Sequence, residues 1–353
     1  MTLRIALDAM GGELGPEEMV AGAIQAVEGS DLDVVLIGDE NILNRVLQKQ
    51  SQATSRLHVI HASQTVAMDE SPFEAIRKKK DSSIVKAFDY VKNSQADAVV
   101  SAGNSGATMA SAIRSLGRLE KIARPGIASI FPTLKKPLVM MDVGANVDCR
   151  PQHLFQFGVM GAAFSDNLFQ IRRPSIGLLS IGEEGSKGNI LVKSAHELFR
   201  KSSLNFIGNV EGRDIFQGDV DVIVCDGFVG NVCLKVSEGL AEAIISMLRS
   251  EMSKSLMAKT GYLLAKKAFG NFGKRVDYAE YGGAPLLGVN GTGIVCHGRS
   301  NAKAIKNAIK VAAEMIRSRV NDYIIQLLSE SSPGYVTEIP AGTVPATPPG
   351  EEA

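Results

Sequence analysis

The sequence predicts an α/β fold with a mostly parallel sheet, and three observations support that prediction. Short apolar runs without polar alternation recur along the chain, as expected of strands that are covered on both faces. A Gly-rich or polar loop follows each run, and a segment with helical spacing of apolar residues follows each loop. Strand–helix–strand order of this kind is typical of α/β proteins. The unit recurs in segments 3–27, 32–48, 96–116, 137–164, 175–199, 204–216 and 219–240.

The loops that follow the predicted strands combine glycine with an acid or an amide. In chain order they include "DAMGGELGP", "SAGNSGAT", "DVGANVD", "IGEEGSKGN", "GNVEGRD" and "CDGFVGN". In a parallel sheet such loops emerge at one edge, which is where α/β proteins bind their ligands. We therefore expect these loops to form one site, rather than to serve only as tight turns.

Residues 245–276 break this rhythm and predict a basic amphipathic helical hairpin. The segment has no acidic residue after Glu251, and we expect Gly261 to end one helix and start the second. Such a hairpin can rest on an anionic bilayer surface or serve as a dimerisation element, and the two roles are compatible. Its basic residues alternate with large apolar ones and are Lys254, Lys259, Lys266, Lys267, Lys274 and Arg275.

The C-terminal part is predicted to form a helix and a tail. One long helix is expected over 297–328, capped by Ser300 or Asn301. From Ser331 the chain is rich in Pro and Gly and has little to bury, so residues 331–353 are expected to be disordered. Residues 1–330 are accordingly expected to form a single α/β domain that carries the hairpin.

Composition excludes several functional classes. The net charge is zero and Trp is absent, so the chain offers neither a basic field nor a base-stacking surface for nucleic acid. The four cysteines have no C-x-x-C or zinc-site spacing, and free thiols in a chain of this size suggest a reducing cytoplasm. The N-terminus has no signal-peptide pattern, and no uncharged apolar run of about 18 residues is present to span a membrane.

Familiar cofactor and nucleophile motifs are missing as well. No loop matches the dinucleotide pattern G-x-G-x-x-G, a Walker loop or the G-x-S-x-G turn, and no histidines have metal-ligand spacing. What remains are Gly-rich helix entrances, which bind anions through free N–H groups and the helix dipole. They are accompanied by Lys187, Arg213, Arg150, Asn104, Asn146 and Asn231. These features predict an anion site whose reaction needs neither a metal nor a cofactor.

Seven ordered motifs resemble the bacterial phosphate acyltransferases of phospholipid synthesis, also called acyl-carrier-protein:phosphate transacylases. The likeness runs from residue 3 to about 328. The family usually has Asp where this chain has Glu13, and Thr is common where it has Ser105. The motifs are "LDAMGGELGP", "SAGNSGAT", "DVGANVD", "IGEEGSKGN", "FIGNVEGRDI", "CDGFVGNVCLKVSEG" and "YGGAPLLGV".

The resemblance implies a three-layer αβα fold, similar to that of isocitrate and isopropylmalate dehydrogenases and of phosphate acetyltransferases, assembled as a homodimer. It implies that a long-chain acyl thioester on acyl carrier protein reacts with inorganic phosphate to give acyl phosphate and the free carrier thiol. The product would pass to the membrane acyltransferase that acylates glycerol 3-phosphate. We therefore expect a cytoplasmic enzyme in peripheral contact with the membrane.

That chemistry assigns roles to particular residues. Lys187 and Arg213 are predicted to hold phosphate beside the thioester. Asn231, with the backbone N–H groups of Gly230 and Asn231, is predicted to bind the oxyanion of the tetrahedral intermediate. Cys225 is interpreted as a packing residue, because direct attack by phosphate needs no acyl-enzyme. Further substrate-binding candidates are Asn104, Ser105, Asn146, Asp8 and Asp226, of which the two aspartates can orient a cation or simply cap their loops.

A basic run before a helix predicted to be capped by Ser82 is a candidate docking surface for acyl carrier protein, which is expected to be acidic. It consists of Arg77, Lys78, Lys79 and Lys80. An ordinary solvated stretch is the alternative interpretation, and both apply equally to Arg114, Arg118, Lys121 and Arg124. The long acyl chain needs an apolar groove, for which the hairpin is a candidate.

Three other functions remain to be separated. A dehydrogenase of the isopropylmalate type would need clustered metal-binding acids and a nicotinamide loop, and neither pattern is present. A phosphate acetyltransferase-like enzyme would act on acyl-CoA instead of a carrier protein, a choice that the basic clusters disfavour only weakly. A non-enzymatic membrane scaffold would not depend on Lys187.

Overall fold

The computed structural model describes residues 2–50, 55–276 and 278–331, apart from the side chains of Leu256, Asn271, Lys274, Arg275, Val276 and Tyr278. The predicted tail therefore lies outside the described residues from residue 332 onward. The side chains of Lys274 and Arg275, which were assigned to the basic face of the hairpin, lie outside them too.

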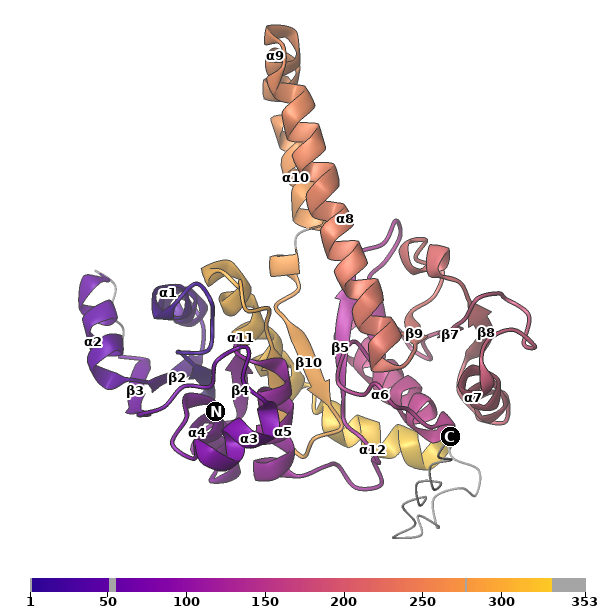
Figure 1. Ribbon diagram of the computed structural model, residues 1–353, viewed down its shortest axis with the longest axis horizontal. Helices are drawn as coiled ribbons and strands as arrows, with labels where there is room; N and C mark the ends of the chain where they lie inside the picture. The colour runs from indigo at the N-terminus through magenta and orange to yellow at the C-terminus, as the bar shows by residue number, and fades with distance from the viewer. Residues whose placement is uncertain (1, 51–54, 277, 332–353) are drawn as a thin grey trace, which may run out of the picture.

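The described strands form one eleven-stranded sheet in the order β3-β2-β1-β4-β11-β10-β5-β6-β9-β7-β8 (Figure 1). Neighbouring strands pair in parallel except at β11–β10, β10–β5 and β5–β6. The mostly parallel sheet is thus confirmed. The strands are β1 Leu3–Asp8, β2 Leu32–Gly38, β3 Leu57–His61, β4 Ala98–Ser101, β5 Gly126–Phe131, β6 Leu138–Met141, β7 Ile176–Leu179, β8 Phe206–Val210, β9 Val222–Val224, β10 Ala284–Leu287 and β11 Thr292–Val295.

The antiparallel steps at the centre reverse the strand direction. Because three such steps separate β11 from β6, the parallel group β3-β2-β1-β4-β11 runs opposite to the group β6-β9-β7-β8. The prediction that all Gly-rich loops leave a single edge is therefore wrong. The loops after β1, β4 and β11 leave one edge, and those after β6, β9, β7 and β8 leave the other. The apolar run of a buried strand does not encode the direction in which it pairs.

Helices cover both faces of the sheet, which gives the three layers. Along β1, Ile5 and Leu7 join one buried cluster and Ala6 joins the other, as alternation along a strand requires. The first cluster includes α1 Pro16–Val27, α2 Glu40–Lys49, α6 Pro151–Phe169, α7 Ile190–Arg200, α11 Ala302–Arg317 and α12 Val320–Ser331. The second includes α3 Pro72–Lys78, α4 Ser83–Lys92, α5 Ser105–Leu116 and the 3-10 helix η1 Gly212–Phe216.

Polar residues of the loops begin many of these helices. The side chains of Asn104, Asp226 and Asn301 each accept a hydrogen bond from a backbone N–H in the first helical turn. Such caps satisfy N–H groups that the helix leaves without a partner. The cap predicted at Asn301 is confirmed. Asn104 and Asp226 are also helix caps, independently of any role in binding substrate.

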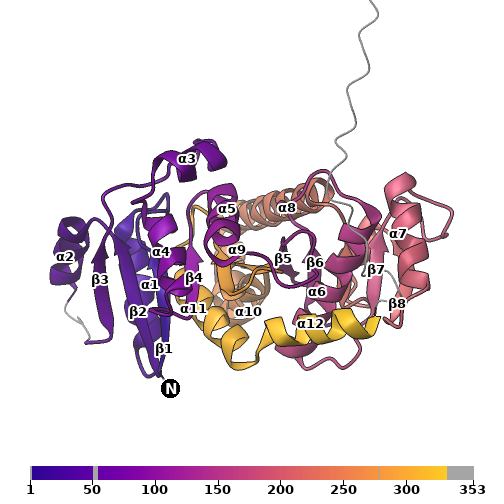
Figure 2. The ribbon, with the colours of Figure 1, turned by 90° about the horizontal axis from the view of Figure 1, so that it is seen from below.

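The C-terminal helix is two helices instead of one. The helix α11 ends at Arg317, the chain leaves the helical conformation at Arg319, whose φ is 54°, and α12 follows. This break turns α12 against α6, so α12 crosses the molecule below the sheet (Figure 2). An arginine in this conformation carries no sequence signal comparable to that of glycine, so the continuous apolar spacing misled the prediction.

The helix α8 Gly227–Ser253 starts within the body and projects far beyond it (Figure 1). The helices α9 Leu256–Leu264 and α10 Lys266–Val276 return toward the body, followed by η2 Tyr278–Glu280. Gly261 lies inside α9, so the expectation that it separates two helices is wrong; the chain turns near Ser255, which caps α9, and at Ala265. Within the described chain, no helix has the length and apolar character needed to cross a bilayer.

Gly22 marks the closest approach of α1 to α11. A Cβ at this position would lie 2.6 Å from Ile305 Cβ and 2.7 Å from the Ala302 carbonyl oxygen. The two helices therefore pack in close contact because one of them lacks a side chain there.

We predict that Gly22→Ala lowers the free energy of unfolding by about 1–3 kcal/mol, since the added methyl group overpacks this contact. The matched control is Gly261→Ala in α9, where a Cβ meets no atom within 4 Å and where alanine favours the helix. Urea denaturation of both variants checks the prediction, and equal stability of the two would contradict it.

Candidate functional site

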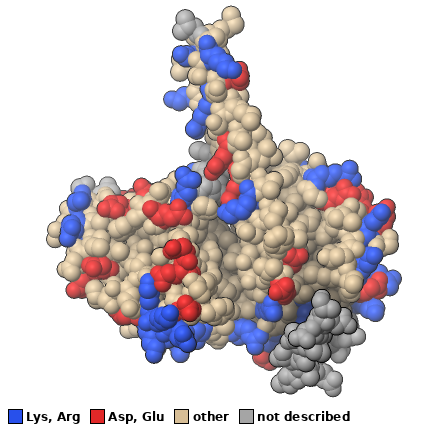
Figure 3. All heavy atoms as spheres, viewed as in Figure 1, with Lys and Arg blue, Asp and Glu red and all other residues tan. Residues whose placement is uncertain are grey.

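A cavity of about 1530 Å³ lies between the body and α8, and the surface is hollowed beside the lower part of that helix (Figure 3). Loops from both parallel groups reach it. The loops after β1, β4 and β11 contribute Leu14, Ser105 and His297, and those after β6 and β9 contribute Gly144 and Asn231. Several of the predicted loops therefore converge over the central strands and not along one edge of the sheet, whereas the loop after β7 contributes no lining residue.

Asn231 and Ser105 are predicted site residues that line this cavity with exposed polar side chains, and Asn231 is the one that carries an amide. Its side chain is exposed, lines the cavity and has no hydrogen-bond partner among the described residues. The loop after β6 passes close by, because a Cβ at Gly144 would lie 3.6 Å from Asn231 Oδ1. A carboxamide in this position can donate a hydrogen bond to a bound oxyanion.

The backbone donors predicted beside Asn231 are not available. The N–H of Gly230 donates to the Asp226 carbonyl at 3.0 Å, and Asn231 lies beyond the first turn of α8. Both N–H groups therefore belong to the helix. Gly230 has a packing role instead, since a Cβ there would lie 1.9 Å from the Asp142 carbonyl oxygen. The strand-to-helix turn could be located in the sequence, but not the residue at which helical hydrogen bonding begins.

Asp142 holds the start of α8 in place, because its backbone packs against Gly230 and its side chain binds the neighbouring loops. Its buried carboxylate accepts hydrogen bonds from the N–H groups of Ile127, Ala145 and Asn146 at 3.0, 3.2 and 2.7 Å. It also accepts one from the Asn146 side chain at 2.9 Å. Burial raises the pKa of this carboxyl, and the hydrogen bonds oppose that effect.

Asn104 and Asn146 have no amide N–H left for a substrate. Asn146 Nδ2 donates to the Pro125 carbonyl at 2.8 Å as well as to Asp142. Asn104 Nδ2 donates to the carbonyls of Met68 and Glu70 at 3.0 and 3.1 Å, while its Oδ1 caps α5. Both residues therefore position loops in this structure, and neither has an amide N–H free for the substrate-binding role predicted for it.

Asp8 is buried beneath the Gly-rich loop after β1. Only 1% of its surface is exposed, and the Ser101 hydroxyl donates to its carboxylate at 2.8 Å. Gly11 must lack a side chain here, because a Cβ would lie 2.6 Å from Asp8 Oδ2. Burial raises the pKa of Asp8. Asp8 does not line the cavity, so it anchors the loop and is not placed to contact substrate.

Lys187 and Arg213 do not line the cavity, and Arg213 contacts the loop that carries Lys187. Arg213 is exposed and forms ion pairs with Glu183 and Glu211, both at 3.1 Å. These carboxylates raise its pKa, Glu211 most strongly, and they balance its charge. Lys187 is exposed on the loop that contains Glu183 and has no ion pair among the described residues. The structure therefore does not bring these cations together with Asn231.

The loop between β11 and α11 belongs to the site, although its residues were not predicted as site residues. Its residues His297, Arg299 and the buried Ser300 line the cavity. Glu13, which differs from the usual family residue, reaches this loop: a Cβ at Gly298 would lie 2.3 Å from Glu13 Oε1. The signal was present, because "HGRSN" follows a strand and precedes a helix like the other site loops.

The basic run on and after α3 flanks the cavity. A Cβ at Gly106 would lie 2.6 Å from Pro72 Cγ, so α3 packs against the start of α5, where Ser105 lines the cavity. Arg77 and Lys80 are exposed without an ion pair among the described residues. Of the other two, Lys78 pairs with Glu74, and Lys79 binds Glu70 and the Thr65 carbonyl. The basic patch lies over this region in Figure 3.

The cysteines do not resemble nucleophiles. All four are free, and Cys225 and Cys296 are buried. Burial raises the pKa of Cys225 and of the half-buried Cys233, so the reactive thiolate is disfavoured at both. In the described part of the chain, no three His, Cys, Asp or Glu side chains gather in a way that could hold a metal ion.

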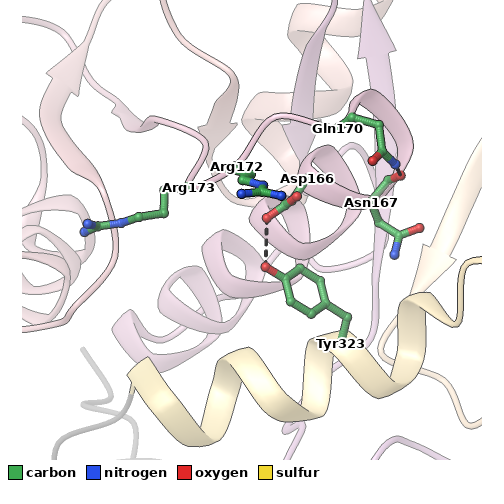
Figure 4. Close-up of a pocket in the computed structure, with 6 residues that line it drawn as sticks. All are labelled: Asp166, Asn167, Gln170, Arg172, Arg173 and Tyr323. Atoms are coloured by element: carbon green, nitrogen blue, oxygen red, sulfur yellow. Dashed lines mark hydrogen bonds between the residues drawn. The ribbon is translucent and has the colours of Figure 1, made fainter.

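A second pocket of about 450 Å³ lies at the end of α6 (Figure 4). The Tyr323 hydroxyl donates to Asp166 at 2.8 Å, and burial raises the pKa of Tyr323 to about 12. Arg173 points away from this pair in Figure 4, so the charged groups do not converge on one point. The pocket shares no lining residue with the large cavity and contains no predicted site residue.

Comparisons with known proteins agree with this architecture. Residues 3–323 match the family described as "Fatty acid synthesis protein". A phosphate acyltransferase from Syntrophotalea carbinolica is 55% identical over 329 residues, covering 93% of this chain and 95% of that protein. The chain therefore belongs to the fatty acid synthesis protein family and, within it, to the phosphate acyltransferases. It is an enzyme of the acyltransferase class.

Solved structures support the fold at low sequence identity. A phosphotransacetylase from Streptococcus pyogenes superposes with a TM-score of 0.60 at 18% identity, covering 90% of this chain and 94% of that one. A 4-hydroxythreonine-4-phosphate dehydrogenase from Klebsiella pneumoniae gives a TM-score of 0.52 at 13% identity, covering 90% of this chain and 100% of that one. The predicted similarity to the fold of phosphate acetyltransferases and dehydrogenases is confirmed.

We predict that the difference in stability between the wild type and Asp8→Asn depends on pH. The folded pKa of Asp8 is raised above 3.8, so the native state holds the proton more tightly than the unfolded chain. Wild-type stability therefore falls relative to the variant as pH rises above about 3.8, by at most about 1.4 kcal/mol per unit, and levels off above the folded pKa. Urea unfolding of both proteins from pH 4 to 8 measures this, and a pH-independent difference would contradict it.

Proposed function

We propose that this enzyme transfers a long-chain acyl group from acyl carrier protein to inorganic phosphate. The observation that carries the proposal is the large cavity, which has an unpaired carboxamide at one end and a mostly apolar continuation at the other. The relatives of this chain support phosphate as the acceptor, because they are named phosphate acyltransferases. We add acyl carrier protein as the donor of the acyl group.

In the proposed reaction, an oxygen of hydrogen phosphate attacks the thioester carbonyl carbon. The tetrahedral intermediate collapses with cleavage of the carbon–sulfur bond, and the proton of hydrogen phosphate ends on the carrier thiol. The products are acyl phosphate and free carrier protein. Phosphate is already a nucleophile near neutral pH, so binding and orientation are the main tasks of the protein.

Asn231 is proposed to donate its amide N–H to the oxyanion as the carbonyl becomes tetrahedral. Lys187 does not line the cavity, and it is kept as a proposed phosphate contact only because its loop follows β7 and leaves the same edge of the sheet as the start of α8. Arg213 is proposed to hold that loop through Glu183. Arg299 and Ser300 join the site as additional candidates for contact with phosphate.

The carrier protein is proposed to dock on the basic surface formed by Arg77, Lys78 and Lys80. Lys79 is excluded from this surface because its ammonium group is already bound to Glu70 and Thr65. The exposed Phe73, of which 80% is accessible, adds an apolar contact to the patch. Positive charge beside the cavity mouth would steer an acidic partner toward Ser105 and Asn231.

The outward face of α8 is proposed to form a homodimer contact. An "outer stripe" of exposed apolar side chains recurs along it at helical spacing and consists of Phe228, Val232, Val236, Leu240, Ile244 and Met247. A contiguous apolar surface of this length is typical of an interaction site. Sedimentation of the purified protein tests the assignment, which a monomer at micromolar concentration would refute.

The tip of the hairpin is proposed to touch an anionic bilayer. Met257 and Leu264 are 85% and 90% exposed, and Lys259, Lys266 and Lys267 are exposed beside them. Apolar side chains with flanking lysines suit peripheral insertion. The enzyme would thus work in the cytoplasm at the membrane surface and pass acyl phosphate to the membrane acyltransferase that uses glycerol 3-phosphate. Cosedimentation with anionic vesicles checks the contact.

We predict that the purified enzyme releases carrier thiol from long-chain acyl-carrier protein only when orthophosphate is present. The rate of thiol release and the formation of acyl hydroxamate with hydroxylamine measure the two products. Equal specificity constants for acyl-CoA would favour the phosphate acetyltransferase-like alternative, and the absence of phosphate-dependent release from both donors would refute the proposed function.

We predict that Asn231→Ala lowers kcat by about 10²–10³-fold with little change in KM for the carrier protein, as expected for loss of an oxyanion donor. The matched control is Asn41→Ala, since Asn41 is also an exposed asparagine near the start of a helix but lies outside the cavity. A loss of less than about threefold for Asn231→Ala, or an equal loss in both variants, would remove Asn231 from the mechanism.

A further inference from the structure

The large cavity continues beyond the site loops along one face of α8. The α8 side chains that line it recur every three or four residues, as one helix face requires. They include Asn231, Leu234, Glu238, Ala241, Ile245, Leu248 and Met252. At about 1.5 Å per residue, this face extends about 32 Å from Asn231 to Met252. It lies opposite the outer stripe on the same helix.

The wall that faces α8 is apolar along most of this length. Near the body it is formed by Ile130 and Phe131 of β5, and farther out by Tyr262, Phe269 and Phe272 of the returning hairpin helices. We call the space between these walls and α8 the hairpin groove. Charged residues line it too, but Lys235 and Glu238 pair with each other at 2.7 Å, and Glu242 and Arg249 are exposed.

We propose that the hairpin groove binds the acyl chain of the thioester, with the carbonyl at Asn231 and the methyl end toward Met252 and Phe269. This inference rests on the proposed function and adds the path of the chain. The groove is continuous with the site and apolar along its walls, which matches an acyl chain attached to a polar head. A second copy of the protein fits the outer stripe instead, because that face of α8 is exposed and points away from the groove.

Ala241 is proposed to determine which chain lengths fit. It is a small side chain in the α8 wall between Leu234 and Ile245, and it lies about 15 Å along the helix from Asn231. With C–C bonds of about 1.5 Å, eight carbons span less than about 12 Å and end before Ala241, whereas sixteen carbons pass it. A larger residue at 241 would therefore block long chains and leave short ones unaffected.

We predict a chain-length-selective loss in Ala241→Phe. Each buried methylene contributes about fourfold in affinity, equivalent to about 0.8 kcal/mol. Binding of eight-carbon and sixteen-carbon S-acyl pantetheine, measured by calorimetry without phosphate, should show at least a tenfold weaker affinity for the longer thioester. The shorter thioester should bind within twofold of the wild type. Ala241→Leu should show a smaller loss in the same direction.

The matched control is Ser246→Phe, which adds the same ring on an exposed part of α8 outside the groove and should leave both affinities unchanged. Thermal unfolding establishes that each variant is folded. Equal losses for both chain lengths in Ala241→Phe and Ala241→Leu would refute binding of the acyl chain in the hairpin groove. Wild-type affinity that does not rise with chain length would refute it as well. The binding measurement needs no turnover. Chain-length-dependent binding without phosphate-dependent thiol release would therefore refute the proposed function but still support acyl-chain binding in the hairpin groove.

Discussion

The position of α8 depends on the buried carboxylate of Asp142. That group collects four hydrogen bonds from β5 and from the loop after β6, while the Asp142 carbonyl oxygen fills the space that a side chain at Gly230 would need. Asn146 continues the connection, since its carbonyl accepts from Gly227 N–H at 2.7 Å. Asn231 lies one turn after Gly227 and directly after Gly230. Asp142, which does not line the cavity, therefore fixes the part of α8 from which the exposed carboxamide projects.

The antiparallel strands at the centre of the sheet determine where the loops of the two halves meet. In a doubly wound sheet of uniform direction, a site forms where loops leave a single edge. Here β10 and β5 reverse the direction, so loops from the two halves meet over the middle of the molecule. The long helix that starts in one half closes the same space, which explains why the cavity is both large and elongated.

Much of this architecture was accessible from the sequence, because buried strands and helical spacing depend on local apolar patterns. The loops that line the cavity were also largely identified, since glycine next to an acid or an amide marks a strand-to-helix turn. Hydrogen-bond partners were not accessible: Asn104 and Asn146 look as available as Asn231 in the sequence, but their N–H groups are bound to distant carbonyls. Strand direction and the break at Arg319 also depend on tertiary contacts, which a local pattern does not report.

The helix α8 presents two faces to two different environments, and this has a consequence for its length. Inserting or deleting one residue within it would rotate everything beyond by about 100°. Beyond the change, the apolar side chains of the outer stripe and the residues that line the groove would both be rotated away from the faces that they now occupy. Changes of seven residues, close to two whole turns, would preserve both faces. The length of α8 between Asn231 and Met252 can therefore change only in steps of about two turns if both faces are to keep their orientation.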